Sequence, residues 1–260
     1  MRERPYNHPD PEKPRYALTD HLPKRPPSET IKVVSYNIQY SLRIPQAIEL
    51  LTQNLETHEA DILCLQEMTP EAVKEIALKL HYNYVYYPAA YHPKIKNDFG
   101  NAILSKWPII HDQKIIFPKI SHERMQRIAV QATVDCGVHK LLVFSVHTKM
   151  LMTPNQWPIP MNTLLKHVPP AIPYSLIAGD FNTLWSKSTK TIAGLLAQAN
   201  FDWVHDKSCW TYQYKYFFNK KSYLDHIFVK GFTVRKFGHI LNFKVSDHLP
   251  LWAELTWLHQ

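Results

Sequence analysis

The sequence predicts an α/β fold, a four-layer α/β sandwich in which two mostly antiparallel β-sheets pack face to face and are flanked by helices. Three observations predict it. Short segments rich in apolar and β-branched residues recur along the chain, helical segments separate the first of them, and 260 residues suffice for one large sandwich. We therefore expect one folded domain over residues 31–260.

Residues 1–30 are expected to form a poorly ordered tail or a strap lying on the domain. They hold seven prolines and charges of both signs, a composition that buries too little apolar surface to offset the cost of ordering. They also lack the apolar stretch of a secretory signal, so a cytoplasmic location is expected.

The domain opens with alternating strands and helices, predicted over residues 31–38, 46–57, 61–67 and 71–80. The last of these helices has a clear start signal, because Thr69 offers an N-cap, Pro70 suits the first helical position and Glu71 places an acid in the first turn. The chain thus begins as strand, helix, strand, helix.

Strands dominate the rest of the chain, over residues 82–87, 100–105, 126–134, 140–146, 174–178, 223–229 and 250–255. Residues 153–173 hold six prolines. This stretch is therefore predicted to be a long surface loop with at most a short helix at 163–167.

Composition narrows the possible partners. The formal charge of +8 and the pI near 9.2 favour polyanions such as nucleic acid or phospholipid head groups. No run of about 18 apolar residues is present to span a bilayer. Cys64, Cys136 and Cys209 lie far apart without a CxxC pair, which argues against a disulfide framework and a thiolate zinc site.

Polar residues at the ends of predicted apolar strands are the most informative feature of the sequence. They are Asn37, Glu67, His147, Asp180 and Asn182, with Asp225 and Asp247 completing the set. Carboxylates beside apolar strands are costly unless they are paired or bound to metal, so the pattern predicts one shared site. Carboxylate and amide oxygens suit a hard cation, Mg²⁺ or Mn²⁺.

The motifs of several other enzyme classes are absent. The sequence contains no HExxH, no GxxxxGK[ST] and no GxSxG. Metal-assisted phosphoryl chemistry is therefore the best match, with a phosphoester as substrate.

Seven phrases resemble the successive motifs of the endonuclease/exonuclease/phosphatase superfamily. They are SYNI (35–38), DILCLQE (61–67), FGNAILSKWPI (99–109), SVHT (145–148), GDFNT (179–183), YLDHIFVKG (223–231) and SDHLPLWAEL (246–255). GDFN and SDHLP are each weakly specific, but the order of all seven is strong support. The resemblance spans almost the whole chain after residue 30 and implies that 31–260 is the family's catalytic domain.

The resemblance also implies roles for individual residues. Glu67 resembles the principal metal ligand, with Asn37 and Asp247 close to the ion or the phosphate. Asp180 looks like the group that takes a proton from the attacking water. Asn182, two residues on, would help to hold the nucleophile and the phosphate.

Two histidines complete the set that the family implies. His248 resembles the histidine that contacts the scissile phosphate, and Asp225 resembles the acid that fixes its tautomer and favours its charged form. His147 matches a second histidine of the deoxyribonuclease, sphingomyelinase and deadenylase branches. His226 is expected to be a core histidine, because it should face the opposite side of its strand from Asp225.

Other positions keep two interpretations. Asn101 sits where the family often places a substrate-facing amide, but a buried turn is equally consistent. Arg127, together with Arg124 and Lys149, either lines an anionic cleft or faces water. The alternating aromatics of 210–216 either stack bases or form one packed strand face.

The leading hypothesis is a nuclease or related phosphodiesterase. The AP endonuclease branch fits poorly, because Met68 and Thr69 follow Glu67 where that branch has a lysine two residues on. A lipid phosphodiesterase or phosphatase of the sphingomyelinase or phosphoinositide type is the alternative. It would require peripheral membrane contact through an exposed apolar loop near Trp157. A catalytically silent scaffold is a third hypothesis, and no oligomeric state is predicted.

Overall fold

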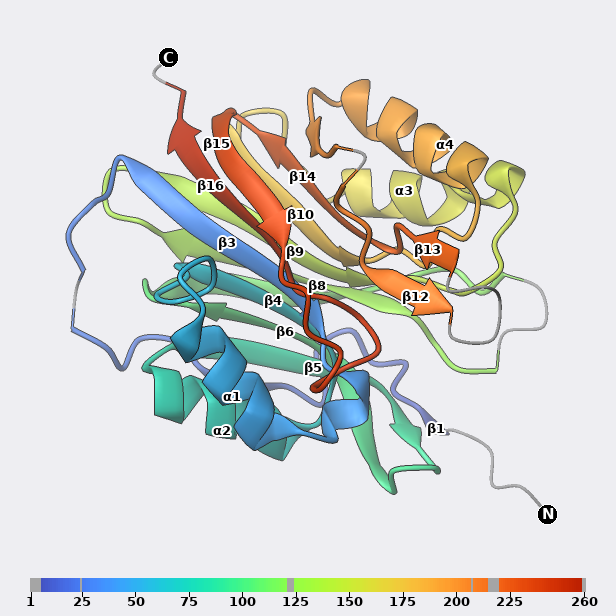
Figure 1. Ribbon diagram of the computed structural model, residues 1–260, viewed down its shortest axis with the longest axis horizontal. Helices are drawn as coiled ribbons and strands as arrows, with labels where there is room; N and C mark the ends of the chain where they lie inside the picture. Colours follow the sequence, from blue (N-terminus) through green and yellow to red (C-terminus); the bar gives the residue numbers. More distant parts are fainter. Residues whose placement is uncertain (1–5, 24, 121–123, 207, 215–219, 259–260) are drawn as a thin grey trace.

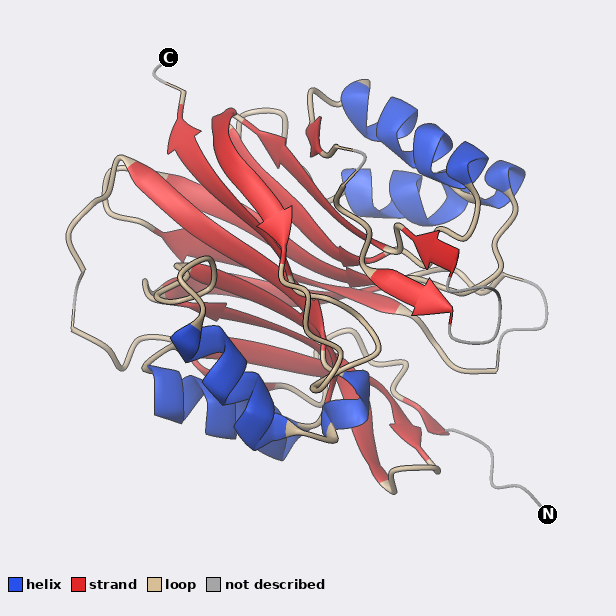
Figure 2. Cartoon of the chain, in the orientation of Figure 1, coloured by secondary structure: helices blue, strands red, loops and turns tan. Residues whose placement is uncertain are grey.

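The computed structural model describes residues 6–23, 25–120, 124–206, 208–214 and 220–258 as two large β-sheets with helices outside them (Figures 1 and 2). The first sheet contains β1 (Tyr6–Asn7), β2 (Tyr16–Leu18), β3 (Thr30–Asn37), β4 (Ile62–Met68), β5 (Asn83–His92), β6 (Asn97–Ser105), β15 (Phe232–His239) and β16 (Leu251–Trp257). The second contains β7 (Ile109–Ile116), β8 (Ile128–Asp135), β9 (Lys140–His147), β10 (Tyr174–Asp180), β11 (Asp202–Val204) and β14 (Asp225–Lys230).

Most strand pairs are antiparallel. The first sheet has the order β1-β5-β6-β4-β3-β16-β15, with β2 also paired to β5, and the second has the order β11-β14-β10-β9-β8-β7. Two pairs are parallel, β3 with β4 and β9 with β10. A short additional pair, β12 (Tyr212–Tyr214) with β13 (Lys220–Ser222), lies apart from both sheets.

Helices cover the outer face of each sheet, as Figure 2 shows. The first sheet carries α1 (Ile44–Gln53) and α2 (Pro70–Leu80), and the second carries α3 (Pro158–Leu165) and α4 (Ser186–Ala197). Thr69 caps α2, since its hydroxyl accepts the Ala72 N–H at 3.4 Å and Pro70 occupies the first turn. The predicted four-layer α/β sandwich is confirmed.

Three apolar cores correspond to the three interfaces between these four layers. One lies between the sheets and includes Ile62, Val143 and Leu176. The second packs α1 and α2 against the first sheet, and the third packs α3 and α4 against the second sheet around the fully buried Trp157 and Phe144. Burial of this apolar surface is the main stabilising contribution to such a fold.

The proline-rich stretch 153–173 differs from the predicted loop. It contains a 3₁₀ turn, η2 (Pro154–Gln156), and then α3, which begins at Pro158. Prolines in a first helical turn cost no hydrogen bond, because the N–H groups there have no partner within the helix. Trp157, Met161 and Leu164 are buried, so tertiary packing stabilises a helix that composition argued against.

The described residues of the N-terminal segment pair with the edge of the first sheet. β1 and β2 pair with β5, which covers part of that edge of the first sheet. Polar anchors hold the segment: Arg15 makes two hydrogen bonds of 2.7 Å to the Asp112 carboxylate, and Lys114 Nζ donates to the carbonyls of His8 and Lys13. The domain boundary at residue 31 stays a prediction.

Within the described ranges, α4 is the longest helix at 12 residues, and none of the helices there is long and apolar enough to cross a membrane. Cys64, Cys136 and Cys209 are buried free thiols.

Candidate active site

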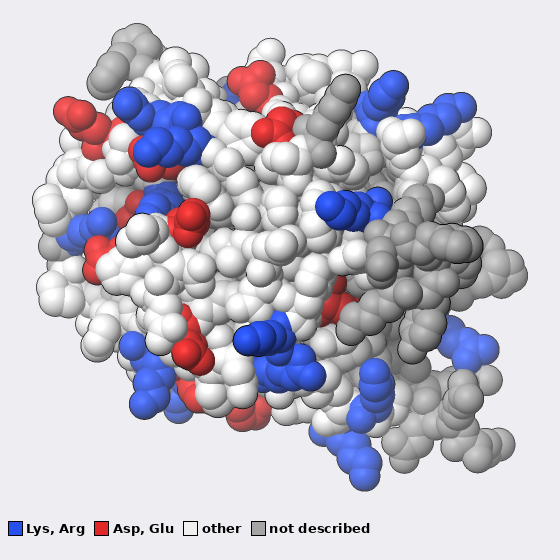
Figure 3. All heavy atoms as spheres, in the orientation of Figure 1, with Lys and Arg blue, Asp and Glu red and all other residues white. Residues whose placement is uncertain are grey.

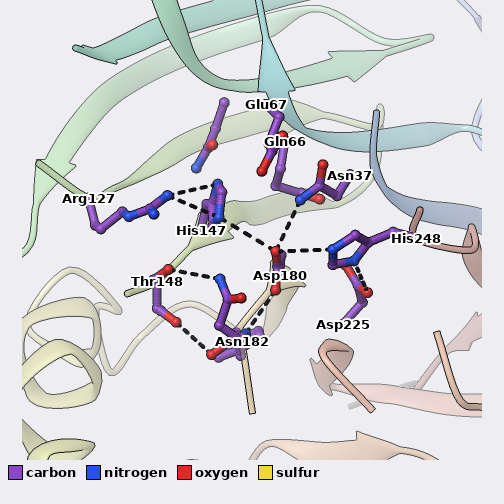
Figure 4. Close-up of polar contacts among 12 residues, drawn as sticks. Asn37, Gln66, Glu67, Arg127, His147, Thr148, Asp180, Asn182, Asp225 and His248 are labelled. Atoms are coloured by element: carbon purple, nitrogen blue, oxygen red, sulfur yellow. Dashed lines mark hydrogen bonds and ion pairs between the residues drawn. The ribbon is translucent and has the colours of Figure 1, made fainter. Parts of the chain in front are cut away.

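The two parallel strand pairs bring the predicted site residues to one end of the sandwich. Asn37 ends β3 and pairs with Gln66 of β4, and Asp180 ends β10 and pairs with His147 of β9. Glu67 follows Gln66 directly. Since the carboxyl ends of these four strands meet where the two sheets face each other, their last side chains point toward one another (Figure 4).

Asp180 lies at the centre of this cluster and is only 1% exposed. Its Oδ2 accepts a hydrogen bond from Asn37 Nδ2 at 3.0 Å and lies 3.5 Å from His147 Nε2 and 3.8 Å from His248 Nε2. Burial raises the pKa of Asp180 to about 7, and the nearby Asp225 adds to the rise, although the positive charge of His248 opposes it. A carboxylate that titrates near neutrality suits a general base.

His248 and Asp225 form a buried pair beside Asp180. His248 Nδ1 lies 2.8 Å from Asp225 Oδ2, which orients the ring so that Nε2 faces Asp180. Burial by itself lowers the pKa of His248, but the carboxylates of Asp225 and Asp180 outweigh it and raise that pKa to about 10. The imidazole is therefore positively charged at neutral pH.

The turn that carries His248 is fastened to β3. Ser246 Oγ donates to the Asn37 carbonyl at 2.7 Å and accepts the His248 N–H at 3.1 Å. Asp225 is held in a similar way, because its N–H donates to Thr211 Oγ1 at 3.1 Å. Backbone positions distant in sequence are thus fixed before any ligand binds.

The end of β10 depends on a glycine, and the loop that follows it holds Asp180 in place. Gly179 has a φ of +150°, and a Cβ there would lie 2.0 Å from the Val146 carbonyl oxygen. Asn182 adopts a left-handed φ of +53°, with its N–H donating to Asp180 Oδ1 at 2.8 Å and its Nδ2 donating to the Thr148 carbonyl at 3.1 Å. The backbone of this loop therefore holds the Asp180 carboxylate in a fixed orientation.

Glu67 is also held in an unusual backbone conformation. Its φ is +59°, at an irregularity in the pairing of β4 with β6 between Leu65 and Met68. Its Oε2 accepts the Tyr40 N–H at 3.1 Å, from the 3₁₀ turn η1 (Gln39–Ser41) where Tyr40 itself has a φ of +56°. Such outliers cluster at functional sites, where the surrounding structure maintains the strain.

The donor set around Glu67 fits a hard divalent cation. Burial raises the pKa of Glu67, the charges of His248 and Arg127 oppose the rise, and the negative charge of Asp247 adds to it. Two neighbouring acids and the Asn37 amide supply oxygen donors, and a cation would relieve the repulsion between the acids. These three are the residues predicted as metal ligands.

Asp180, Asp225 and His248 also lie close enough together to hold an ion. We prefer to interpret this trio as an ion-pair network. A protonated His248 has no lone pair to offer a metal, and its two neighbouring carboxylates already compensate its charge.

His147 differs from His248 in its charge. Arg127 Nη1 lies 3.1 Å from His147 Nε2, and burial together with the Arg127 charge lowers the pKa of His147 well below its usual value. A neutral His147 that accepts from Arg127 makes no ion pair with Asp180, despite the 3.5 Å separation. Arg127 is thus part of the site, next to His147.

Asn101 has a structural role between the two sheets. Its Nδ2 donates to the Ile128 carbonyl at 3.1 Å and to the Ser145 carbonyl at 3.2 Å, and the residue is 1% exposed. The amide nitrogen is therefore taken up by links between the sheets, which favours the buried alternative over a substrate-facing amide.

His226 is a buried core histidine, since its Nε2 lies 2.7 Å from Thr183 Oγ1 on the side away from Asp225.

Several contributors were not predicted, among them Thr211, whose hydroxyl accepts the Asp225 N–H. Tyr40 acts through its backbone N–H, which no sequence pattern reveals. Ser246 and Thr148 lie within the SDHLP and SVHT motifs, so their positions were marked although their contacts were not. Of the alternating aromatics, Trp210 is buried and the ring centroids of Tyr212 and His248 lie 5.1 Å apart, which favours a packed strand face over base stacking. Lys215 and Tyr216 lie outside the described residues.

Comparisons with known proteins agree with this geometry. A family model described as the Endonuclease/Exonuclease/phosphatase family matches residues 34–248. A search of curated proteins finds no match. Among solved structures, the chain is similar to an endonuclease/exonuclease/phosphatase from Beutenbergia cavernae DSM 12333, with a TM-score of 0.72 and 16% identity over 89% of this chain and 72% of that one.

Two further solved structures are of known activity or ligand. D. rerio TDP2, complexed with a single-strand DNA product, matches with a TM-score of 0.67 and 17% identity over 88% of this chain and 100% of that one. A mannosyl-6-phosphatase from Bacteroides thetaiotaomicron VPI-5482 matches with a TM-score of 0.67 and 16% identity over 87% and 100%. At these identities the likeness shows the fold alone.

Proposed function

The chain belongs to the endonuclease/exonuclease/phosphatase family, whose members are divalent-metal-dependent phosphoesterases, and we propose that it is a nuclease or related phosphodiesterase. The observation that carries the proposal is the position of Asp180. Its carboxylate lies between Asn37, His147 and a charged His248, inside a cluster that also contains two further acids for a metal.

We assign Asp180 as the group that accepts a proton from the attacking water. A buried carboxylate with a pKa of about 7 accepts a proton readily at the pH of most cells, and Asn37 donates to the same oxygen, which fixes its direction. Asn182 is the neighbour that we assign to holding the nucleophile and the phosphate.

We assign His248 as the group that contacts the scissile phosphate and stabilises its charge. In-line attack at phosphorus places negative charge on the phosphoryl oxygens, and a charged imidazole held in place by Asp225 stabilises that charge without reorganising. Asp225 is then a positioning residue, because it acts through His248. Arg127 and His147 would line the site on the other side of Asp180 from His248.

Glu67, Asp247 and Asn37 are the residues that would hold the cation, Mg²⁺ or Mn²⁺. When bound, such an ion supplies Lewis-acid stabilisation of the phosphoryl oxygens and lowers the pKa of a water.

Nucleic acid is the favoured substrate class. The net charge of +8 attracts polyanions, and D. rerio TDP2 is a structural neighbour bound to single-strand DNA. On the face shown in Figure 3, lysine and arginine side chains are spread among acidic ones, so the charge gives a general attraction and no single patch on that face.

The test is a substrate screen with Mg²⁺ or Mn²⁺ against plasmid, single-stranded RNA, sphingomyelin, inositol phosphates and sugar phosphates. Cleavage of nucleic acid that stops on chelation and in His248→Ala, with the fold intact by circular dichroism, is the expected result. A wild-type rate in His248→Ala would contradict the assigned role of the imidazole.

One observation favours a lipid phosphodiesterase as a second candidate. Trp157 itself is fully buried, yet Met150 and Leu151, in the loop that follows His147, are 51% and 64% exposed. Exposed apolar side chains at the tip of a loop beside an active site suit contact with a membrane surface. Sedimentation with vesicles and hydrolysis of sphingomyelin, both lost in Leu151→Ser, would favour this candidate.

A further inference from the structure

A cavity of about 720 Å³ lies beside the loop that carries Asn182. One wall begins at Thr183, the next residue along the chain. Another contains Tyr223, two residues before Asp225, and a third contains Thr153, which follows β9. Each wall therefore continues a chain segment that supplies a residue to the candidate active site.

The walls are tied to one another. Thr183 Oγ1 donates to the Tyr223 carbonyl and accepts from His226 Nε2, and the Phe181 N–H donates to the Leu224 carbonyl at 2.8 Å. The cavity is thus held against the start of β14, and α4 begins beside β13 at its outer side (Figure 1).

The lining combines positive charge with an open aromatic ring. Trp185, just before α4, is 46% exposed, and Lys187 in the first turn of α4 is also exposed. Lys221 of β13 lies on the facing wall, with its Nζ 4.4 Å from the Trp210 ring centroid. No acid is among the described lining residues, and most of the others carry hydroxyl groups.

We propose that this cavity binds a nucleotide next to the scissile phosphate of a single-stranded nucleic acid, with its base stacked on Trp185 and its phosphate attracted by Lys187 and Lys221. This inference rests on the proposed function, because it extends the substrate beyond the reacting bond. Bases stack on exposed aromatic rings with little regard to sequence, while lysines follow the backbone. Stacking on Trp185 requires a base that is unpaired and turned out of the strand, so the site is expected to prefer single strands.

Most of the residues that line the cavity carry a hydroxyl group or a positive charge, so they can hydrogen-bond to a sugar and attract a phosphate. The volume falls in the range of small-ligand sites, about 300–1,000 Å³, which suits one nucleotide.

Binding is measured by fluorescence anisotropy of a labelled single-stranded oligonucleotide with the full chain in EDTA, so that hydrolysis does not intervene. Trp185→Ala is expected to raise Kd about fivefold or more, while Trp185→Phe restores binding because it keeps a stacking ring. Lys187→Ala should reduce the slope of log Kd against log salt by about 0.7, the value for one phosphate contact on a single strand. Lys190→Ala, an exposed lysine of the same helix outside the cavity, is the matched control.

Hydrolysis of a small aryl phosphodiester provides the second readout, since that substrate has no flanking nucleotide. Trp185→Ala should leave its kcat/KM unchanged and raise KM for the oligonucleotide. If the wild type bound oligonucleotide with these Trp185 and Lys187 effects but hydrolysed no phosphoester, the proposed function would fail and the binding site would stand.

Three results overturn the inference. Wild-type Kd for the oligonucleotide in both Trp185→Ala and Lys187→Ala would exclude the cavity as a strand-binding site. Equal binding of single strands and duplex would remove the selectivity. Loss of binding to phosphatidylglycerol vesicles in Trp185→Ala, with oligonucleotide binding intact, would assign the surface to lipid.

Discussion

Replacing Asp225 by Asn should remove the charge that keeps His248 protonated. The two groups are 2.8 Å apart. At an effective dielectric constant of about 20, a pair of unit charges at that distance interacts by about 6 kcal/mol, equivalent to about 4 pKa units. The pKa of His248, raised to about 10 in the wild type, would fall to about 6 in the variant.

The consequence for activity depends on pH in a defined direction. His248 must be protonated to stabilise the phosphoryl oxygens, so activity is lost as the pH rises through its pKa. In Asp225→Asn the charged fraction at pH 8 is about one in a hundred, and at pH 7 about one in ten. We therefore expect kcat/KM to fall about 100-fold at pH 8 and about tenfold at pH 7.

The assay is kcat/KM for an aryl phosphodiester between pH 6 and 9.5, at saturating Mg²⁺. Asp202→Asn, an exposed acid at the start of β11, serves as the control and should follow the wild-type profile. A loss of equal size at every pH would mean that Asp225 only supports the structure, and an unchanged profile would refute the reasoning about the His248 charge.

Four other changes have expected outcomes. Asp180→Asn should lower kcat by at least about 100-fold, because general-base catalysis contributes about that much. The loss of activity below about pH 7 that the wild type should show in a pH profile measured alongside should be absent from the profile of the variant. Gly179→Ala should destabilise the fold by several degrees in Tm and abolish activity, since its Cβ would lie 2.0 Å from the Val146 carbonyl oxygen; a normal Tm would count against the close approach of β9 and β10. His226, whose pKa burial lowers to about 3, stays neutral when folded, so its own contribution to stability is full above pH 6.5 and falls by about 2 kcal/mol between pH 7 and pH 5. Denaturant titrations of the wild type and of His226→Gln at both pH values isolate that contribution, and the difference between their free energies of unfolding should change by about that amount. Thr69→Ala should cost about 1 kcal/mol through loss of the α2 N-cap, and no change in the denaturation midpoint would show that the 3.4 Å contact contributes nothing.

Much of the site was predictable because its residues interrupt apolar strands. Asn37 and Asp180 each end a strand and Glu67 is the last residue but one of β4. The apolar residues of these strands are evident in the sequence, and strand ends converge when strands run parallel. The pairing of Asp225 with His248, 23 positions apart, was expected from the family resemblance and is present in the structure. The charge state of His147 was not predictable, because it depends on Arg127 reaching it across the fold.

The parts that sequence reasoning missed depend on tertiary contacts. The α3 helix was not predicted because the prolines around it indicated a loop. Its stability comes from burial of Trp157 between the helix and the second sheet. No helix was predicted for residues 186–197, since the polar start of α4, SKSTKT, gives a weak apolar pattern. The order of residues 6–18 depends on ion pairs such as Arg15 with Asp112, which lie about a hundred positions apart and leave no local signal.

The central claim is that acids and amides from distant strands form one cation site that supports phosphoester hydrolysis. It is tested most directly by measuring Mn²⁺ binding by electron paramagnetic resonance together with phosphodiester hydrolysis in Glu67→Gln, with Glu71→Gln on α2 as the matched control. We predict that Glu67→Gln binds Mn²⁺ at least about tenfold more weakly and loses hydrolysis, while the control retains both. Wild-type Mn²⁺ affinity and turnover in Glu67→Gln would contradict the claim.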